Sequence, residues 1–500
     1  MAKKSIEINL AGIKIIKNSA APPLYSQLYE QFRQMILSKR LRPGDRLPAT
    51  RDLAIELGVS RTIITQSFEQ LILEGYLLGK TGSGTFVADV LPDSLINAAT
   101  SEKKNFVPDN GKSFEKTADL IPEELLHRNC NKEDVTPFQT GHAALDLFPY
   151  NIWYEVSKKV FKNLKQYPLG YEESIGYEPL RNEIAKYLRI SRAVKCEAEQ
   201  IIIVNGSQQG LNLIVQCLLK RGDRIWMEDP GYHGMKFACL NRNVTICPVP
   251  VEKDGINVNF GISKYPEAKL AYVTPSHQFP LGVTLSLNKR LQLLEWANQR
   301  NMWILEDDYD SEFQYEGQPL ASLQGLDNNG TVIYSGTFSK VLFPGLRLAY
   351  IVLPTIEMVY ELKKVKGMMD RQSPILDQII LSKFIEEGHF LRHIRKMRLL
   401  YSERRKILVK LIEENLSDYL TVEPSASGMN ITASLSEKID VQKLKEEAKI
   451  NGVIVPFIND YTLENFIKPS VTLGFTGFTK YILKTGIQKL VTCMQNSLIT

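Results

Sequence analysis

Five short apolar runs in the middle of this 500-residue chain each end in a group of polar side chains. The runs alternate with stretches of helical spacing, which predicts an α/β domain with a largely parallel sheet. Open sheets of this kind bind ligands at the carboxyl ends of their strands. We therefore expect one site to gather the polar endings that follow residues 201–204, 225–227, 270–273, 303–305 and 332–334.

The last of these endings reads Ser-Gly-Thr-Phe-Ser-Lys and supplies an amine, Lys340, that can form a Schiff base with an aldehyde. Groups that bind anions lie around this lysine in the sequence, or at the start of a predicted helix, where backbone amides point outward. These candidate phosphate ligands are Thr337, Ser339, Arg347, Ser207 and Gln208. A reactive amine and an anion site together suit a phosphorylated aldehyde.

The other endings offer groups that suit an aromatic ring. Asp307 can keep a pyridine nitrogen protonated, so that the ring acts as an electron sink. Tyr232 can stack on a flat ring. A ring oxygen can be hydrogen-bonded by His277 or Gln278, together with Tyr309. The five endings therefore predict a site for pyridoxal phosphate.

Each residue taken alone also has an ordinary structural explanation. A lysine is usually a surface charge, and an aspartate after a strand often caps a helix. Tyr232 and His277 could be core side chains, and Arg347 could belong to a structural ion pair. It is the order and spacing of the whole set that favour the cofactor site.

The basic excess of the chain lies in its first fifth. Residues 1–90 hold 12 lysines and arginines against 8 acidic residues, whereas the rest of the chain holds 49 against 48. This asymmetry is typical of a nucleic-acid-binding module beside a neutral domain, although a basic arm without a partner would give the same charge.

The same region has the pattern of a helix-turn-helix. Two short predicted helices flank a Gly-Val-Ser turn at residues 58–60, and the glycine-rich run 79–87 predicts a β-hairpin wing. The second helix is polar on its outer face, which could reach base edges, and nearby arginines could contact phosphates. The expected DNA contacts are Arg46, Arg51, Arg61, Thr62, Thr65, Gln66, Gly82 and Gly84.

The run LRPGDRLPATRDLAIELGVSRTIITQSFEQL and the closing GSGTFV resemble the GntR family of winged-helix regulators. This resemblance implies a winged helix-turn-helix over residues 20–88 that binds a double-stranded DNA operator. Residues 89–136 are polar, contain proline and glycine and lack sustained periodicity, so we expect an inter-domain linker there.

Residues 137–500 resemble a fold-type I aminotransferase domain, and GTFSKVLFPGLRLAYIVLP is close to the cofactor-lysine motif of one branch. A GntR-like reader fused to such a domain resembles the MocR family of regulators. The resemblance implies a large α/β domain, a small C-terminal α+β domain and pyridoxal 5'-phosphate bound to Lys340. It gives the other candidates these roles: Asp307 for the ring nitrogen, Tyr232 for stacking, Tyr309 with His277 and Gln278 for the ring oxygen, and Ser207, Gln208, Thr337, Ser339 and Arg347 for the phosphate.

The resemblance also implies a dimer. Tyr171, in the run LGYEESIGYEPLR, looks like the tyrosine that reaches the phosphate from the other subunit. The arrangement implied is a head-to-tail homodimer with exchanged DNA-binding domains.

One departure from the aminotransferase pattern concerns the substrate carboxylate. Aminotransferases of this type usually hold it with an arginine of the small domain, and this chain has no arginine after Arg405. The corresponding stretches offer other polar side chains, namely Asn459, Asp460, Tyr461 and Thr472. Lys468 could replace the arginine only as a point charge without bidentate geometry. An ordinary amino acid held by an arginine clamp is therefore not the expected ligand.

Three functions fit these features, and the first is favoured. A transcription factor would sense a small amine or amino-acid-like effector, or the cofactor itself, through aldimine chemistry at Lys340. A working aminotransferase with an accessory DNA-binding domain would need a carboxylate clamp. A cofactor-free regulator would keep the fold only as a dimerisation scaffold, against which the intact Lys340, Asp307 and Arg347 argue.

Composition bounds the remaining possibilities. Apolar residues make up 44% of the chain and charged residues 23%, the balance of a globular protein. No stretch approaches the roughly 18 apolar residues of a membrane span. The six cysteines are scattered without a C-x-x-C pair, which argues against a disulfide scaffold and a metal site. We therefore expect a cytoplasmic protein with no metal and no membrane partner.

Overall fold

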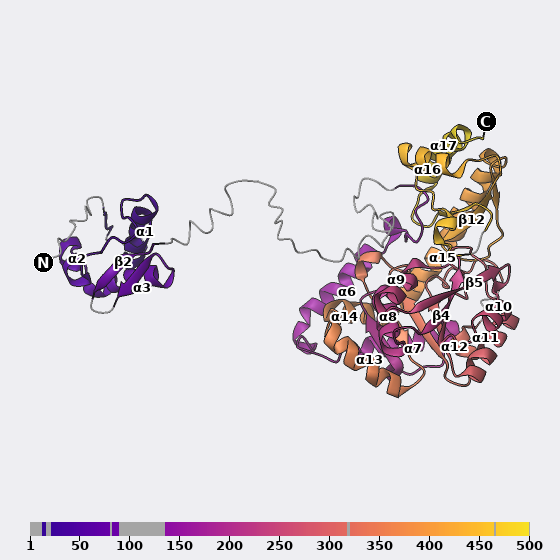
Figure 1. Ribbon diagram of the computed structural model, residues 1–500, viewed down its shortest axis with the longest axis horizontal. Coiled ribbons are helices and arrows are strands. Elements are labelled where there is room, and N and C mark those ends of the chain that lie inside the picture. The colour runs from indigo at the N-terminus through magenta and orange to yellow at the C-terminus, as the bar shows by residue number, and fades with distance from the viewer. Residues whose placement is uncertain are drawn as a thin grey trace. The chain divides into compact units, whose positions relative to one another are not determined.

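The computed structural model describes residues 13–16, 22–80, 83–89, 136–317, 321–464 and 467–499. The chain divides into two compact units, residues 1–128 and 129–500 (Figure 1). Of the predicted linker at 89–136, only the two end residues lie within the described ranges.

The first unit is a small helical bundle with a two-stranded wing. Helices α1 (Leu24–Leu37), α2 (Thr50–Leu57) and α3 (Arg61–Leu73) enclose a core that includes Phe32 and Phe68, whose rings meet edge to face at 5.5 Å. Gly58 ends α2 with φ +63°, a left-handed conformation that favours glycine. Strands β1 (Leu77–Lys80) and β2 (Gly84–Val87) pair antiparallel and form the predicted wing.

The second unit is built on a sheet whose strand order is β3-β10-β9-β8-β7-β4-β5-β6. Its strands are β3 (Ile201–Val204), β4 (Arg224–Asp229), β5 (Thr245–Glu252), β6 (Gly255–Ile256), β7 (Leu270–Val273), β8 (Trp303–Asp308), β9 (Val332–Thr337) and β10 (Ala349–Val352). Neighbours from β9 through β8, β7 and β4 to β5 are parallel. Strand β10 runs antiparallel to both β9 and β3, so β3 runs with the parallel set. The five predicted apolar runs therefore all end at one edge of the sheet.

Helices cover both faces of this sheet, as the buried side chains show. Ile202, Met227 and Leu305 pack under α8 (Ser207–Leu218), α9 (His233–Arg242) and α13 (Ile356–Met369). The opposite face packs on further helices: α6 (Tyr150–Lys162), α7 (Glu178–Arg192), α10 (Val258–Lys264), α11 (Leu287–Arg300), α12 (Leu323–Leu326) and α14 (Ile375–Glu386). A three-layer α/β arrangement results, as predicted.

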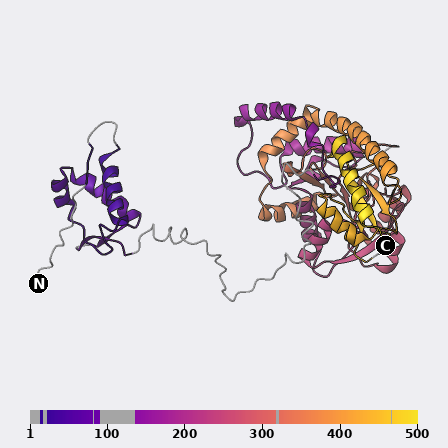
Figure 2. The same cartoon turned by 90° about the horizontal axis from the view of Figure 1, so that it is seen from above.

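A smaller part at the C-terminal end of this unit completes the fold. The long helix α15 (His389–Asn415) leads into an antiparallel sheet of β11 (Leu420–Val422), β12 (Asn430–Leu435) and β13 (Ser470–Gly474). Helices α16 (Val441–Ile450) and α17 (Lys480–Asn496) pack beside one another, and Figure 2 shows them in yellow. Residue Phe138 bridges to Gly474, so the start of this unit pairs with its last strand.

In the described part of the chain, no helix combines the length and the apolar character that crossing a membrane requires. The same residues contain no group of three or more His, Cys, Asp or Glu side chains that could hold a metal ion.

Candidate cofactor site and nucleic-acid interface

Lys340 lies three residues beyond β9, at the edge of the sheet where the parallel strands end. Its Nζ donates a hydrogen bond to the carbonyl oxygen of Gly141 at 3.1 Å. Gly141 has φ +73°, and a Cβ atom there would overlap the Lys340 amine. The left-handed backbone conformation favours glycine at this position, where the 138–142 segment lies against the amine. The sequence offered no signal for Gly141, because the contact joins positions 199 residues apart.

Asp307, on β8, is a buried carboxylate, and one of its oxygens has no hydrogen-bond partner among the described residues. The hydroxyl of Tyr272 donates to Asp307 Oδ2 at 2.8 Å, whereas Oδ1 is buried and has no hydrogen-bond partner among the described residues. Burial raises the pKa of Asp307 to about 6. A buried, partly ionised oxygen of this kind fits a charged N–H donor such as a protonated pyridine nitrogen.

Glu306 and Asp308, which flank Asp307 on β8, point to the other face of the sheet, where their carboxylates have partners. Glu306 accepts hydrogen bonds from the backbone N–H groups of Leu323 and Gln324 at the start of α12. Asp308 pairs with Arg192 of α7 at 2.9 Å. Because side chains alternate along a strand, only Asp307 is turned toward the α8 side.

Arg347, a predicted phosphate ligand, contacts the turn before α8, and Ser207, another, begins that helix. Gly206 precedes α8 with φ +92°, and a Cβ atom there would lie 2.6 Å from Arg347 Nη2, which donates to Asn205 O at 3.2 Å. Ser207 begins the helix, whose leading N–H groups have no partner within it. Ser339 Oγ is buried without a partner among the described residues, and the Ser339 N–H donates to Thr337 Oγ1 at 3.2 Å. This combination of donors suits a phosphate group.

Tyr232 and Gln208 lie together beside the start of α9. Gln208 Nε2 donates to Gly234 O at 2.8 Å, and a Cβ atom on Gly234 would overlap Tyr232. Tyr232 also meets the ring of Phe279 edge to face at 5.9 Å. The structure thus brings the predicted stacking residue next to a predicted phosphate ligand.

His277 and Tyr309 form a hydrogen-bonded pair. The Tyr309 hydroxyl donates to His277 O at 2.9 Å, and His277 Nδ1 lies 2.9 Å from that hydroxyl and 3.0 Å from Asp310 Oδ2. His277 Nε2 is buried and lacks a partner among the described residues. The two residues remain candidates for binding the ring oxygen.

The side chain of Gln278 is used differently. Its Nε2 donates to Pro230 O at 2.9 Å and to Phe279 O at 2.7 Å, and its Oε1 accepts from the Leu281 N–H at 3.0 Å. These bonds tie together two loops of the site. Its assignment to the ring oxygen stays a prediction, because its polar atoms are engaged in these bonds.

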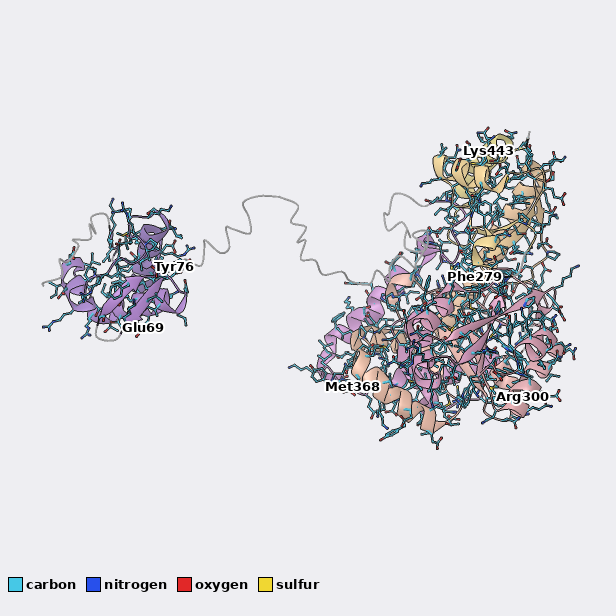
Figure 3. All side chains as sticks on the ribbon, viewed as in Figure 1. Glu69, Tyr76, Phe279, Arg300, Met368 and Lys443 are labelled. Carbon is cyan, nitrogen blue, oxygen red and sulfur yellow. The ribbon has the colours of Figure 1, made fainter. Side chains whose placement is uncertain are left out.

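Phe279 is a residue of this region that the sequence argument missed. Its ring meets those of Tyr232, Tyr309 and Tyr461 edge to face at 5.9, 6.2 and 5.1 Å. Figure 3 labels it where the large sheet meets the small C-terminal part. A phenylalanine among polar endings carries no chemical signal, so only the fold shows its position.

A buried ion pair supports the loop before α8. Asp370 accepts from Lys366 at 2.9 Å, from Asn205 Nδ2 at 2.8 Å and from Gln209 Nε2 at 2.7 Å. The Lys366 side chain is fully buried. Because removing one member of such a network leaves a buried charge unpaired, it holds the Asn205–Gly206 turn firmly.

The small C-terminal part is bonded to the large sheet beside this site. The Asp229 carboxylate accepts from the backbone N–H groups of Leu463 at 2.7 Å and Glu464 at 2.9 Å. Tyr461 O accepts from the Gly231 N–H at 3.1 Å, and its ring stacks on His233 at 4.9 Å. The segment after α16 is therefore held against the Asp229–Pro230–Gly231 turn.

Of the residues predicted at the carboxylate-binding position, two point elsewhere. Asp460 pairs with Lys445 at 2.6 Å, and Asn459 Nδ2 donates to Ile467 O at 3.1 Å. Thr472 is fully buried, and its Oγ1 accepts from Asn430 Nδ2 at 2.8 Å.

Tyr171 lies on the surface of its own chain, with 82% of its area exposed. The guanidinium of Arg371 lies 4.3 Å from the centre of its ring, and the neighbouring Glu172 N–H donates to Gln372 Oε1 at 2.6 Å. The segment is thus held in place while the tyrosine ring faces outward.

In the first unit, the predicted DNA contacts are mostly exposed. Arg61 Nε lies 3.4 Å from Thr50 Oγ1, which joins the first residues of α2 and α3. Arg46 lies against the wing, because a Cβ atom on Gly84 (φ +107°) would be 2.9 Å from its Nε. The other exposed candidates in this unit are Arg51, Thr62 and Gln66.

The two remaining predicted DNA contacts, Thr65 and Gly82, are not among the exposed residues described above. Thr65 is half-buried, and its hydroxyl donates to Arg61 O at 3.0 Å within α3. Gly82 lies outside the described residues.

Two family models match the chain. Residues 24–87 match the gntR family of bacterial regulatory proteins, and residues 149–473 match aminotransferase class I and II. The probable rhizopine catabolism regulatory protein MocR of Rhizobium meliloti is 35% identical over 95% of this chain and 94% of its own length. The chain belongs to the MocR-type family of transcriptional regulators.

Further comparisons agree with this family. The pyridoxine biosynthesis transcriptional regulator PdxR of Corynebacterium glutamicum is 31% identical over 82% of each chain. The kynurenine aminotransferase of Pyrococcus horikoshii, solved in complex with PMP, has 27% identity and a TM-score of 0.70 over 78% of this chain and 98% of its own. The predicted family and fold class are confirmed, and the first unit of this MocR-type chain is a DNA-binding domain.

If Arg61 contacts DNA, the change Arg61→Ala will weaken operator binding. Loss of a phosphate contact should lower the slope of log affinity against log salt by about 1, whereas loss of a base contact should cost about 1–3 kcal/mol at one position of the site. Fluorescence anisotropy at several salt concentrations measures both. Lys39→Gln, an exposed basic residue after α1, is the charge-matched control. Equal affinity of Arg61→Ala and the parent would remove Arg61 from the interface.

If Asp307 Oδ1 binds the cofactor, the Asp307 carboxylate lacks this partner in the cofactor-free protein and should destabilise its folded state. With its pKa raised to about 6, the folded state holds the proton more tightly than the unfolded chain, so stability falls as pH rises from about 4 to about 6. In cofactor-free protein, Asp307→Asn should therefore raise the free energy of unfolding by up to about 3 kcal/mol above about pH 7, and not at about pH 4. The same variant should bind the cofactor more weakly.

Urea unfolding at the two pH values tests this expectation, with the exposed Asp418→Asn as control. A variant that is less stable than the parent at neutral pH would contradict the assignment of Asp307.

Proposed function

We propose that this MocR-type regulator senses a small amine through pyridoxal 5'-phosphate bound in its second unit. One observation carries the proposal: a chain that aligns with a regulator over 95% of its length keeps, at the sheet edge where Lys340 lies, a buried oxygen on Asp307 that has no partner among the described residues. A regulator that used this fold only as a scaffold would have no reason to keep a buried acceptor unsatisfied.

In this proposal, different residues of the site bind different parts of the cofactor. Pyridoxal phosphate supplies an aldehyde that condenses reversibly with amines. Arg347, Ser339 and the first turn of α8 bind its phosphate, and Asp307 accepts the ring N–H. Tyr232 covers the ring, and Tyr309 with His277 orients its oxygen. Lys340 presents the ε-amine, which Gly141 O positions.

The same contacts give a route from the site to the small sheet. The 138–142 segment that touches the Lys340 amine also pairs with β13 through Phe138 and Gly474. With an effector amine bound in place of Lys340, the lysine could change its position, and that change would reach this segment through the bond to Gly141 O. Differential contacts of this kind are what a ligand needs to shift a conformational equilibrium.

A catalytic role is the second candidate, and the aminotransferase fold favours it. The sequence favours the sensor, since the chain has no arginine after Arg405 and Thr472, at the predicted carboxylate-binding position, is hydrogen-bonded to Asn430. A variant of the sensor takes the cofactor as its own signal, which the name of the PdxR relative supports. A regulator of this kind works on the chromosome, so we assign it to the cytoplasm.

We also propose that the regulator acts as a homodimer in which Tyr171 completes the site of the other subunit. Tyr171 is held in place by the 371–372 segment yet exposed, and other large apolar side chains are exposed nearby in the sequence, such as Tyr150, Tyr154 and Leu169. Exposed apolar residues of this size indicate an interaction surface. The head-to-tail exchange of DNA-binding domains remains part of this proposal.

Visible absorption of the purified full-length protein separates sensor from enzyme. With amines but no keto acid, the sensor predicts a cofactor band that shifts with one compound and then persists. Bleaching of that band to the pyridoxamine form would favour the aminotransferase. Lys340→Ala should hold no borohydride-reducible cofactor, whereas Lys364→Ala, at an exposed lysine of α13 that pairs with Glu361 of the same helix, should retain it.

Mixed dimers test the role of Tyr171. Tyr171→Ala and Lys340→Ala should each bind cofactor poorly as separate proteins. Co-expressed and purified through two different tags, their heterodimer regains one complete site if Tyr171 serves the partner's lysine. About half of the parent cofactor content is then expected, since one of the two sites is whole. A heterodimer without cofactor, or a monomeric parent in light scattering, would contradict the shared site.

A further inference from the structure

One face of the small C-terminal sheet is unusual because it is buried and polar but carries no charge. Side chains alternate along β12 and β13, so that Ile431, Ala433, Val471 and Leu473 pack into the core. The other face holds hydroxyl and amide side chains, each at most 8% exposed: Asn430, Thr432, Ser434, Ser470 and Thr472. Buried polar groups cost free energy unless they are hydrogen-bonded. Ser434 is bonded to the Glu423 carboxylate, whereas Asn430, Thr432 and Thr472, at the other end of the face, are hydrogen-bonded to uncharged partners.

This face adjoins the cofactor site at the start of β12. Thr432 Oγ1 donates to Pro280 O at 3.1 Å, and Pro280 directly follows Phe279 in the aromatic group of the site. A Cβ atom on Gly428, two residues before β12, would overlap the ring of His277. The Met429 N–H donates to Asp310 Oδ2 at 3.2 Å, and Asp310 also contacts His277.

A series of backbone contacts at the end of β13 connects this face with the segment that contacts Lys340. Asn430 stands opposite Gly474 in the sheet register, and the Gly474 N–H donates to Phe138 O at 2.8 Å. Three residues beyond Phe138, Gly141 O accepts from Lys340. The hydrogen-bonded pair of Asn430 and Thr472 therefore lies between the aromatic group and the lysine segment.

The basic residues around the small sheet do not supply a carboxylate clamp at this pair. Lys468 lines a hollow with Tyr419 and Ser436, beyond the opposite end of β12 from Asn430, about 17 Å along the strand. Arg404, on α15, pairs with Asp146 at 2.8 Å and also donates to Thr476 O.

Arg405 is the strongest alternative clamp. It donates to Ser425 O and lies 3.6 Å from the carboxylate of Glu316, but its Nε is buried without a partner among the described residues. A ligand carboxylate at Nε would have to share the guanidinium with Glu316. A hydroxyl group, which both donates and accepts, matches Asn430 and Thr472 without needing any cation.

We infer that the effector is a hydroxylated amine without a carboxylate, an amino alcohol or amino polyol, and that Asn430 and Thr472 bind its hydroxyl groups. This rests on the proposed function, because the amine is taken to bind at the cofactor beside Lys340. The specificity follows from charge. A carboxylate buried beside Asn430 and Thr472 would need a counter-ion, whereas a buried hydroxyl group needs only hydrogen-bond partners.

A matched pair of amines tests the inference on the full-length protein loaded with cofactor. 2-Amino-1,3-propanediol and L-serine differ only in a hydroxymethyl group against a carboxylate, and 1-amino-1-deoxysorbitol extends the comparison to a longer polyol. Dissociation constants come from the shift of the cofactor absorption band. We expect at least one amino alcohol to bind about tenfold or more tightly than L-serine.

Two variants locate the contact. Thr472→Val keeps the side-chain shape and removes the hydroxyl, so it should reduce the preference for the amino alcohol about tenfold while cofactor affinity stays at the parent value. Ser434→Ala is the control, since it lies on the same face but is bonded to Glu423, away from the site. Asn430→Ala provides a second variant if Thr472→Val does not fold.

Tighter binding of L-serine than of both amino alcohols would overturn the inference, and loss of that binding in Arg405→Gln would identify Arg405 as the clamp. Equal preference in Thr472→Val, Asn430→Ala and the parent would also overturn it. A protein that binds no cofactor at all, or whose cofactor is not attached to Lys340, would instead overturn the proposed function.

Discussion

The buried carboxylate of Asp307 is the constraint on which the rest of this structure depends. One of its oxygens is held by Tyr272, and the other has no partner among the described residues. Burial alone makes such a group unfavourable, and it raises the carboxyl pKa to about 6. A cationic N–H donor would offset this cost, and we propose that the cofactor ring supplies it. The two other carboxylates of this strand, Glu306 and Asp308, have partners on the opposite face.

The remaining elements bring donors and an amine to the same sheet edge. Because the parallel strands and β3 run in one direction, the Asn205–Gly206 turn, Asp307 and Lys340 meet there although they lie far apart in the sequence. The small C-terminal part closes on this edge through Asp229, which holds two backbone N–H groups, and through the segment that joins Lys340 to β13. In the function proposed here, a ligand at this edge would lie beside both parts of the unit and could shift their arrangement.

Sequence patterns predicted the classes of element and the position of Lys340 just after a strand, because each local signal agreed with the global fold. Two of the five predicted runs end where their strands end, at Val204 and Val273, whereas β4, β8 and β9 continue two or three residues further, to Asp229, Asp308 and Thr337. The Gly58 turn was predicted from a residue whose left-handed conformation favours glycine. Long-range contacts gave no local signal, which is why Gly141 and Phe279 were missed. The contacts of Gln278 also could not be predicted, because both loops that it joins depend on how distant strands pair. Around Thr472, the sequence showed only that an arginine is missing. The hydrogen bond between Asn430 and Thr472 could not be predicted, because it depends on the register of β12 and β13.

The central claim is that an amine at the cofactor changes how this regulator binds DNA. Operator affinity of the full-length, cofactor-loaded protein, measured by fluorescence anisotropy with and without the amine that shifts the cofactor band, tests this directly. The account predicts a change of about 5-fold or more, the usual range of coupling between two sites, and no change in Lys340→Ala. An operator affinity that the amine leaves unaltered in the parent protein, while the cofactor band shifts fully, would contradict the account.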